Sequence, residues 1–422
     1  MTGIGMDSIP SSSPGLSDQE QGVPWRTHII LTGTFTIFAS SCPSHTPPLA
    51  LFTPSSRRLV IPITPVRRQH PVQITALAVD QSPPSPGHIR LVVCLSNGEF
   101  AVHEMQPVHS NTSVCTHTYN PPARTSRTAP ITQAAYHHPL LVTLSQAFHL
   151  SIYDLSDGTV KLSYALGSFT LFPPSSLVLS MPEPQFYKLV LTYSTPVYPA
   201  HWSVGVTELI ISSSPSNSFV PTPLSLMTSA PSAASSPLRL ISTRSTRAFD
   251  VPSGWIDEAK LRLMHEQWSR KLVHVAGTQT DGKWVILAPD SPPTSSPSRH
   301  TYSPASLPLQ LYRLSLPSIH APSAVPKLVF VRHLYGQIGP VAALAVADGR
   351  CVSLAVNGSV WVWDLEGGMG TEVAGSAQGA EGGEESDVSQ PEAAAIKGTV
   401  AFDDRRIITA GVGGIAVRDF DA

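Results

Sequence analysis

Charged residues are scarce in this sequence, which has 27 Lys and Arg and 29 Asp and Glu among its 422 residues. The formal net charge is −2. Binding to nucleic acid or to an anionic membrane surface calls for concentrated positive charge, which the bulk composition does not supply. We therefore expect neither specific nucleic-acid binding nor membrane association.

Cysteines are also few, at positions Cys42, Cys94, Cys115 and Cys351. They lie far apart without a CxxC pair, which excludes a disulfide-dense secreted scaffold and favours a reducing compartment. No charged segment leads into an apolar run within the first 27 residues, so no signal peptide is predicted. The apolar stretch His28–Ser40 is shorter than the roughly 20 residues of a membrane span, and it predicts a strand. We expect the protein in the cytoplasm or nucleus, not secreted.

Catalytic motifs are missing as well. The sequence contains no GxSxG, HExxH or phosphate-binding loop. Its tightest potential metal cluster is His103, His109, Cys115 and His117, of which only the last two have the short spacing of structural zinc ligands. We interpret these residues as loop residues beside a strand. We expect no enzymatic activity, no metal and no cofactor.

Proline, in contrast, is abundant, with 41 residues spread along the chain. An interior proline removes a helical hydrogen bond and clashes with the preceding turn, so a helical domain would not tolerate this number. Short strands joined by turns tolerate it. The composition therefore predicts an all-β protein.

A degenerate internal repeat gives the all-β prediction its form. Its clearest copy is Val341–Leu365, where two apolar strands are followed by the hairpin signal Asn357-Gly358 and a third strand ending in Trp363-Asp364. We expect both turn residues to adopt positive φ. Copies of the same order begin at three other positions: Ile74, Ile131 and Gly398.

Weaker copies fill the remaining length. Tyr187–Ser194 and Leu272–Ala276 each begin one candidate blade, and His28–Ile63 supplies a further sheet, which brings the count to about seven. The last copy stops at Ala422 without a fourth strand. We predict that the N-terminal strand within Thr27–Phe38 supplies it and closes the ring, as protection of sheet edges requires.

The remaining segments are predicted to lie outside the blades. We expect a disordered tail over residues 1–24 and a single propeller over 25–422, with disordered insertions at 213–236, 290–306 and 367–395, because their Ser/Pro-rich or acidic compositions bury little apolar surface. Apolar spacing between Trp255 and Arg270 predicts one helix. We expect it to pack on the nearest surface, with a partner-binding element as the alternative.

With these residues in view, the chain resembles the WD40 repeat family. Trp363-Asp364 matches the family dipeptide, and Tyr153-Asp154 and Arg418-Asp419 are weaker versions. The resemblance implies a structural role for Trp363 and the three aspartates at blade ends. Because Gly-His dipeptides are missing at the blade starts, we expect apolar packing, not a buried His–Asp network, to hold the blades.

A narrower resemblance is to the propeller of fungal F-box/WD40 proteins. It rests on stretches such as Gly254–Glu258, Thr278–Trp284, Leu334–Gln337 and Val417–Asp421. That resemblance implies a substrate-recognition subunit of an SCF-type ubiquitin ligase, with ligase components among its partners. No helical F-box pattern precedes Trp25, which leaves a general WD40 scaffold in trafficking or RNA-related assembly as the alternative.

The functional expectation is a binding platform that presents a ring surface to a protein or peptide, acting as a monomer within a complex. Loops at the rims and around the channel carry specificity in such folds. Aromatic and arginine side chains are enriched at binding hot spots. On that basis alone we select four candidate contact residues: Arg57, Arg124, Trp202 and Tyr335.

Overall fold

The computed structural model describes residues 26–33, 35–52, 58–66, 70–83, 88–106, 113–122, 129–168, 171–198, 200–213, 238–250, 254–290, 308–321, 323–375, 398–411 and 414–420. Most of the expected tail and insertions lie outside these residues. So do three of the candidate residues: Arg57, His109 and Arg124.

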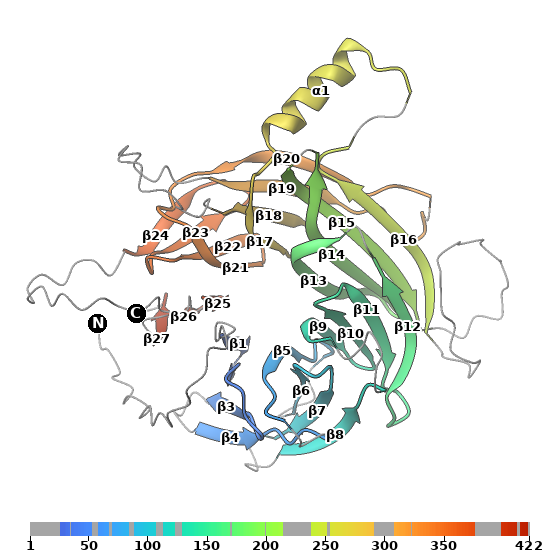
Figure 1. Ribbon diagram of the computed structural model, residues 1–422, viewed down its shortest axis with the longest axis vertical. Helices are drawn as coiled ribbons and strands as arrows, with labels where there is room; N and C mark the ends of the chain where they lie inside the picture. Colours follow the sequence, from blue (N-terminus) through green and yellow to red (C-terminus); the bar gives the residue numbers. More distant parts are fainter. Residues whose placement is uncertain are drawn as a thin grey trace, which may run out of the picture.

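Seven antiparallel sheets stand around a central axis (Figure 1). The all-β, seven-bladed propeller predicted from the repeats is therefore confirmed. Within each sheet the strands follow one another in chain order, so every blade is a simple meander. The innermost strands of successive blades contact one another around the axis.

The blades occupy consecutive stretches of the chain. Blade 1 comprises β1 (Thr27–Thr32), β2 (Phe35–Ser40), β3 (Pro48–Phe52) and β4 (Arg58–Pro62). Blade 2 comprises β5 (Ile74–Val79), β6 (Ile89–Leu95), β7 (Phe100–Met105) and β8 (Ser113–Tyr119). Blade 3 comprises β9 (Ile131–His137), β10 (Leu140–Ser145), β11 (His149–Asp154) and β12 (Lys161–Gly167). Blade 4 comprises β13 (Phe172–Glu183), β14 (Phe186–Val197), β15 (His201–Ser212) and β16 (Arg239–Arg247).

The helix α1 (Glu258–Ser269) separates blades 4 and 5. Blade 5 comprises β17 (Val275–Thr280), β18 (Trp284–Pro289), β19 (Leu309–Ser315) and β20 (Lys327–Leu334). Blade 6 comprises β21 (Val341–Ala347), β22 (Arg350–Ala355), β23 (Val360–Asp364) and β24 (Gly370–Ala374). Blade 7 comprises β25 (Thr399–Phe402), β26 (Arg406–Gly411) and β27 (Gly414–Asp419).

The second strand of each blade is buried on both sides, which explains its continuous apolar sequence. In β6, Leu91 and Val93 pack in a cluster with blade 1, whereas Val92 and Cys94 pack in a cluster with blade 3. Side chains of a strand alternate between the two faces of its sheet, so one strand supplies both contacts. The apolar runs that defined the repeat are therefore the strands shared between neighbouring blades.

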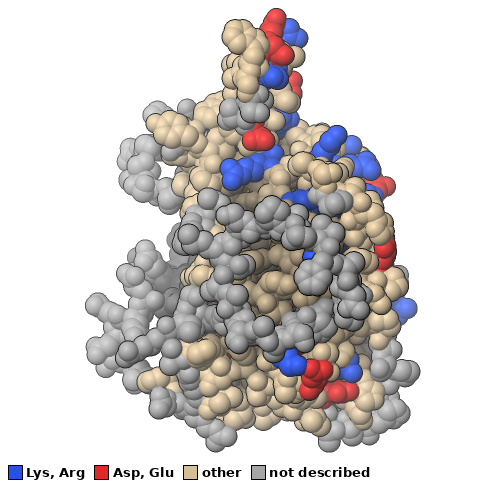
Figure 2. All heavy atoms as spheres, turned by 90° about the vertical axis from the view of Figure 1, so that its right-hand side faces the viewer, with Lys and Arg blue, Asp and Glu red and all other residues tan. Residues whose placement is uncertain are grey.

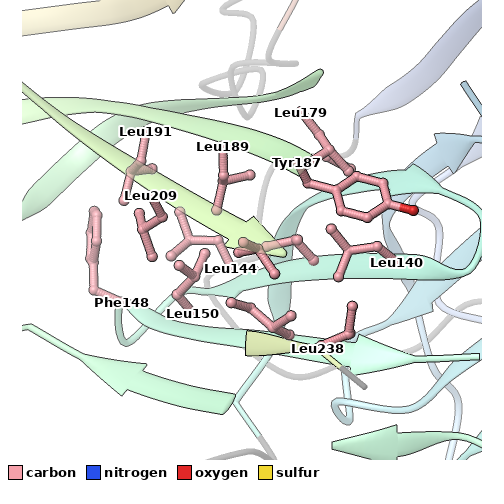
Figure 3. Close-up of a cluster of buried hydrophobic side chains, with 14 of the residues drawn as sticks. Leu140, Leu144, Phe148, Leu150, Leu179, Tyr187, Leu189, Leu191, Leu209 and Leu238 are labelled. Carbon is pink, nitrogen blue, oxygen red and sulfur yellow. The ribbon is translucent and has the colours of Figure 1, made fainter. Parts of the chain in front are cut away.

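Seven apolar clusters hold the ring together, one between each pair of adjacent blades. The largest joins blades 3 and 4, with Leu140 and Leu144 of β10 facing Leu189 and Leu191 of β14 (Figure 3). We call these clusters the seams. Burying a leucine or valine fully contributes about 1.5–3 kcal/mol. The seams therefore supply most of the cohesion between blades. This agrees with the expectation that apolar packing holds the blades.

The ring closes differently from the prediction. β1 is the first strand of blade 1 and pairs with β2 along its whole length, from Thr27 opposite Ser40 to Thr32 opposite Phe35. No strand among the described residues adds to β27. The short β1–β2 connection keeps β1 beside its own sheet, which places it beyond the reach of the outer edge of blade 7. Closure is instead a seam, in which Ile29 packs against Ile408 and Ala410.

Two hydrogen bonds accompany this closing seam. Arg26 Nε donates to Thr399 Oγ1 at 3.2 Å, and Arg406 Nη2 donates to the carbonyl oxygen of Gly33 at 3.3 Å. Both bonds cross from blade 7 to blade 1. They lie at opposite ends of β1, so the closing seam is bonded on both sides of the ring.

Three strand assignments also need correction. Tyr187–Ser194 is the second strand of blade 4, because the inner strand β13 precedes it. Prolines and serines interrupt the apolar pattern of β13, so the sequence analysis did not identify it as a strand. Register shifts at Phe172/Ser175 and Ser180/Glu183 accommodate these residues in the pairing with β14. Blade 5 has an unforeseen outer strand, β20. Finally, β24 lies inside the expected 367–395 insertion, since a short turn brings it back to pair with β23.

In the two Asn-Gly hairpin turns, only the glycine has a positive φ. Gly98 and Gly358 have φ values of 81° and 85°. The preceding asparagines do not share the positive φ that was expected. Each accepts a backbone N–H two residues on, from Glu99 and Ser359, at 3.0 Å.

The closing seam should be measurable by mutation. We expect Ile408→Ala to lower the free energy of unfolding by about 3 kcal/mol, because the side chain is 1% exposed and its removal leaves a cavity between blades 7 and 1. Urea unfolding followed by fluorescence measures the change. Val417→Ala on β27, where the side chain is 54% exposed, serves as the control and should cost less than about 1 kcal/mol. Equal effects of the two variants would contradict closure by this seam.

Candidate functional site

The strand order sorts the connections onto two faces of the ring. Antiparallel strands in chain order place every outer-to-inner connection and every second-to-third connection on one face, which we call the loop face. First-to-second and third-to-fourth connections lie on the other, the hairpin face. The helix α1 lies between β16 and β17 and thus belongs to a loop-face connection.

The central channel is bounded by the seven inner strands and encloses about 540 Å³. Its wall mixes small and apolar residues with polar ones such as Thr75, Gln133, Ser176 and Thr278. Ligand sites in proteins commonly measure 300–1,000 Å³. The channel is thus large enough to receive a side chain or a short loop of a partner.

One formal charge stands in this wall. Arg26 lines the channel where β1 begins, at the loop face, and no carboxylate is found among the described residues that line the cavity. Beyond the bond to Thr399, its guanidinium makes no hydrogen bond to described residues. Burial lowers the pKa of Arg26 without an acidic neighbour to offset it. A guanidinium stays protonated at pH 7 even with a lowered pKa, so Arg26 makes the channel mouth electropositive.

His28 stands next to this charge. Its Nε2 lies 3.0 Å from the carbonyl oxygen of Ile74, so this nitrogen carries the proton and donates. Burial, followed by the charge of Arg26, lowers the pKa of His28 to about 4. The imidazole is therefore neutral at pH 7, and Arg26 remains the charged group of the mouth.

Polar groups of the channel wall are only partly paired. Gln133 Nε2 donates to Ser175 Oγ at 3.0 Å, and Ser176 Oγ donates to Gln279 Oε1 at 2.9 Å. The Thr278 hydroxyl, on a residue that is 2% exposed, has no partner among the described residues. Such a wall offers hydrogen bonds to a polar ligand group.

Exposed apolar side chains concentrate in the loop-face connections. Tyr198 is 88% exposed, Tyr335 68% and Trp255 86%. The further members of this set are Val66, Ile256, Leu261, Leu263, Trp268, Val273, Ile338 and Val356. In the hairpin-face connections the described members are Val325, Met369 and Phe420. Large exposed apolar groups mark interaction surfaces, so the loop face is the candidate interface.

The helix α1 contributes a separate arm to this surface. Asp257 caps it by accepting from the Lys260 N–H at 2.8 Å, and none of its side chains is buried. It stands clear of the ring (Figure 1) and projects from the body in the perpendicular view (Figure 2). The expected packing on the nearest surface is therefore wrong. Near its C-terminal end, Trp268 contacts the rings of His201 and Phe249.

The hairpin face is occupied by structural bonds. Asp154 Oδ1 accepts the Ser156 N–H at 3.0 Å, and the Asp364 carboxylate accepts those of Glu366 and Gly367 at 3.0 and 3.2 Å. Trp363 is fully buried in the seam between blades 5 and 6, and Asp419 ends β27 in an exposed position. These four residues lie at blade ends, away from the channel mouth.

Sequence reasoning missed the bonds that link blades on this face. Asp80 accepts the His138 N–H at 2.9 Å between blades 2 and 3, and Arg350 pairs with Asp404 at 3.0 Å between blades 6 and 7. Their partners lie 54 residues or more away in the sequence. No local pattern signals such pairs.

The candidate contact residues do not share one environment. Trp202 and Tyr335 both lie on the loop face. Trp202 packs its ring on Phe172 at 5.4 Å and pairs its backbone with Leu272, so its surroundings are those of a packed residue. Tyr335 is largely exposed. Arg26, which the sequence did not single out, is the residue that the fold brings to the channel mouth.

The three potential zinc ligands that the structure describes are strand residues, not loop residues. His103 lies on β7, and Cys115 and His117 lie on β8. Among the described residues no group of three or more His, Cys, Asp or Glu side chains converges on one point. In the same part of the chain, no helix is long and apolar enough to cross a membrane.

The pH dependence of stability should report on His28. Its folded pKa of about 4 lies below the unfolded value of 6.5. The unfolded chain therefore binds the extra proton, and the stability present above pH 6.5 is lost between pH 6.5 and about 4. At pH 5 the loss from this residue is about 2 kcal/mol.

We expect His28→Gln, which keeps a donor for Ile74, to lose about 2 kcal/mol less stability than the native protein between pH 7.5 and pH 5. Urea unfolding at both pH values measures the difference. The exposed residue His45 offers a matched His45→Gln control, which should behave like the native protein. A His28→Gln variant with the native pH dependence would contradict the neutral, buried state of His28.

The chain is similar to several solved structures. Similar solved structures include the WD40 β-propeller domain of Doa1, with 11% identity, a TM-score of 0.40, and coverage of 93% of this chain and 90% of that one. BamB from Moraxella catarrhalis has 9% identity, a TM-score of 0.40, and coverage of 94% and 85%. The designed protein Ika8 has 11% identity, a TM-score of 0.41, and coverage of 93% and 83%.

No curated protein sequence matches the chain. A family model does match, over residues 54–407, and it describes the β-propeller of F-box protein pof12. The matched range runs from the end of blade 1 into β26 of blade 7. The chain therefore belongs to the F-box protein pof12 β-propeller family.

Proposed function

We propose that this propeller is the non-enzymatic substrate-recognition part of an SCF-type ubiquitin ligase, with its loop face as the binding surface. The family match over residues 54–407 is the observation that carries the proposal. An F-box protein joins a ligase through its F-box, and its propeller is left to hold a second protein. In this ring the hairpin face carries bonds between blades, and the loop face exposes apolar side chains to which a second protein can bind.

The loop face suits a protein partner better than the hairpin face does. Its connections expose aromatic side chains such as Tyr198 and Tyr335, which anchor many interfaces. The hairpin face instead uses its polar groups to join blades, as in the Arg350–Asp404 pair. Protein binding at the loop face therefore leaves the hairpin-face bonds between blades intact.

The channel mouth adds chemical selectivity. Arg26 stands there without a carboxylate partner, beside a neutral His28. A carboxylate or phosphate group of the bound protein would satisfy the free terminal nitrogens of the guanidinium with charge-assisted hydrogen bonds. We therefore expect partners that present an acidic group to the mouth and apolar side chains to the surrounding loops.

Affinity purification of the full chain tests the ligase role. We expect the adaptor and cullin subunits of the ligase to be recovered with the protein, together with substrates that accumulate when the proteasome is inhibited. Recovery of other stable partners without the adaptor and cullin would contradict the ligase role. That result would favour a general scaffold in trafficking or RNA-related assembly.

Paired variants test the loop face. Tyr335→Ala and Arg26→Gln should each reduce recovery of a bound substrate about tenfold or more, in line with a hot-spot loss of about 1.4 kcal/mol or more. Met369→Ala, at a hairpin-face side chain that is 75% exposed, is the matched control and should retain binding. Thermal melting should be unchanged for Tyr335→Ala and Met369→Ala. Loss of binding in Met369→Ala alone would move the interface to the hairpin face.

A further inference from the structure

The third strand of blade 7, β27, forms an open sheet edge. Each of the other six sheets has four strands, whereas blade 7 has three among the described residues. In Figure 1, blade 7 lies on the left of the ring, between β24 of blade 6 and β4 of blade 1. We call the open side of β27 the β27 edge. A fourth strand of the same meander would lie against this edge, antiparallel to β27.

The side chains of β27 are exposed where other blades bury theirs. Ile415 is 47% exposed and Val417 is 54% exposed. The third strands of blades 2, 3 and 4 consist mostly of buried residues. In those blades a fourth strand covers the third. The exposure of Ile415 and Val417 therefore marks the position that a further strand would cover.

The seam between blades 7 and 1 is short for the same reason. Val417 lies opposite Ile408 and Ile415 lies opposite Ala410, so all four side chains are on the face of blade 7 that turns to blade 1. Between blades 5 and 6 the fourth strand lengthens the seam, because Val331 of β20 packs against it. Among the described residues, no fourth strand of blade 7 does so.

Blade 1 offers apolar side chains for such a strand to pack against. Leu59 and Ile61 of β4 pack toward blade 2, so Val60 between them is turned to blade 7. Val60 is 47% exposed. Phe52 lies on the same face and contacts Phe38, with 5.3 Å between the ring centroids. An apolar residue on the added strand would therefore be buried between the two blades.

The backbone of β27 supplies hydrogen bonds at the same edge. The N–H of Phe420 donates to the carbonyl oxygen of Arg405 at 2.7 Å, toward β26. Polar groups of a strand point alternately to its two sides, so Ile415, Val417 and Asp419 turn their N–H and C=O groups away from β26. A row of such groups is a template for pairing with an extended chain.

Arg418 determines the charge that a fitting strand carries. Its side chain lies on the face toward blade 6, opposite Ile407 of the seam between blades 6 and 7. Its Nη1 donates to the Thr409 hydroxyl at 3.2 Å. Burial lowers the pKa of Arg418, and no acidic neighbour among the described residues offsets this shift. An acidic side chain directly across from Arg418 would supply the missing countercharge.

We propose that the β27 edge binds an extended segment of a second protein, which adds to blade 7 as its antiparallel fourth strand. Along that segment, an acidic residue lies opposite Arg418, the next residue is apolar and lies opposite Val417, and a second apolar residue two positions later lies opposite Ile415. The pattern is acid–apolar–any–apolar. The site uses none of the loop-face residues, so it is independent of the ligase role.

Two labelled peptides that differ in one residue test this pattern: Thr-Glu-Val-Thr-Val-Thr and Thr-Lys-Val-Thr-Val-Thr. We expect the purified full chain to bind the Glu peptide about tenfold more tightly, because Arg418 forms an opposite-charge pair with the first and a like-charge pair with the second. Fluorescence anisotropy measures both affinities. Equal affinities, or no binding of the Glu peptide at millimolar concentration, would overturn the proposal.

Three variants locate the site. Arg418→Glu should invert the preference, so that the Lys peptide binds about tenfold more tightly. Val417→Asp places a charge in the apolar pattern and should abolish binding of both peptides. Val329→Asp, at a side chain of the outer strand β20 that is 56% exposed, is the matched control and should retain the native affinities. Thermal melting should confirm that all three variants fold. An unchanged preference in Arg418→Glu, or binding that survives Val417→Asp, would place the peptide elsewhere.

The same measurements separate two other occupants of the β27 edge. Peptide binding that appears only after removal of residues 1–25 would assign the edge to the chain's own N-terminal segment. Self-association of the purified chain that Val417→Asp abolishes would assign the edge to a second copy. Either result would overturn the proposal of a partner segment.

Discussion

Apolar contact between adjacent blades is the interaction on which the rest of this structure depends. Each second strand is shared between two seams, so no blade has a complete core of its own. Leu91 and Val92 show the principle: neighbours in the sequence, they pack against opposite blades. Stability is therefore a property of the closed ring, and the loss of one seam weakens the two blades that share it.

Closure by a seam also shapes the candidate site. Because β1 stays in the sheet of blade 1, its first residues come to the channel wall beside the inner strand of blade 7. Arg26 is bonded across that junction and stands at the channel mouth. The charge at the mouth is thus a consequence of where the ring closes. The same feature that seals the fold supplies the group proposed to select acidic partners.

The hairpin face serves stability, and the loop face is the one proposed to serve recognition. On the hairpin face, aspartates cap turns and bridge blades. On the loop face, the connections leave side chains exposed and carry the projecting helix α1. The seams hold the blades together, while the channel and the loop face lie outside them.

Much of the architecture was predictable from local sequence. Apolar runs such as Ile89–Leu95 predicted the shared strands, because a strand buried on both sides carries few polar residues. Glycine turns such as Gly358 and the dipeptide Trp363-Asp364 marked where strands meet, because their backbone and side-chain requirements are local. Segments without that contrast escaped detection: β13 is interrupted by proline, and β24 is polar because it is exposed.

The sequence by itself determined the strand repeat, the number of blades and the apolar character of the seams, since all three follow from the alternation of residues along single strands. The tertiary structure alone decided that the ring closes by a seam between blades 7 and 1 and that a charge stands at the channel mouth. Each of these depends on residues from different blades meeting in space. Arg26 and Thr399 are 373 positions apart, and no local pattern joins them.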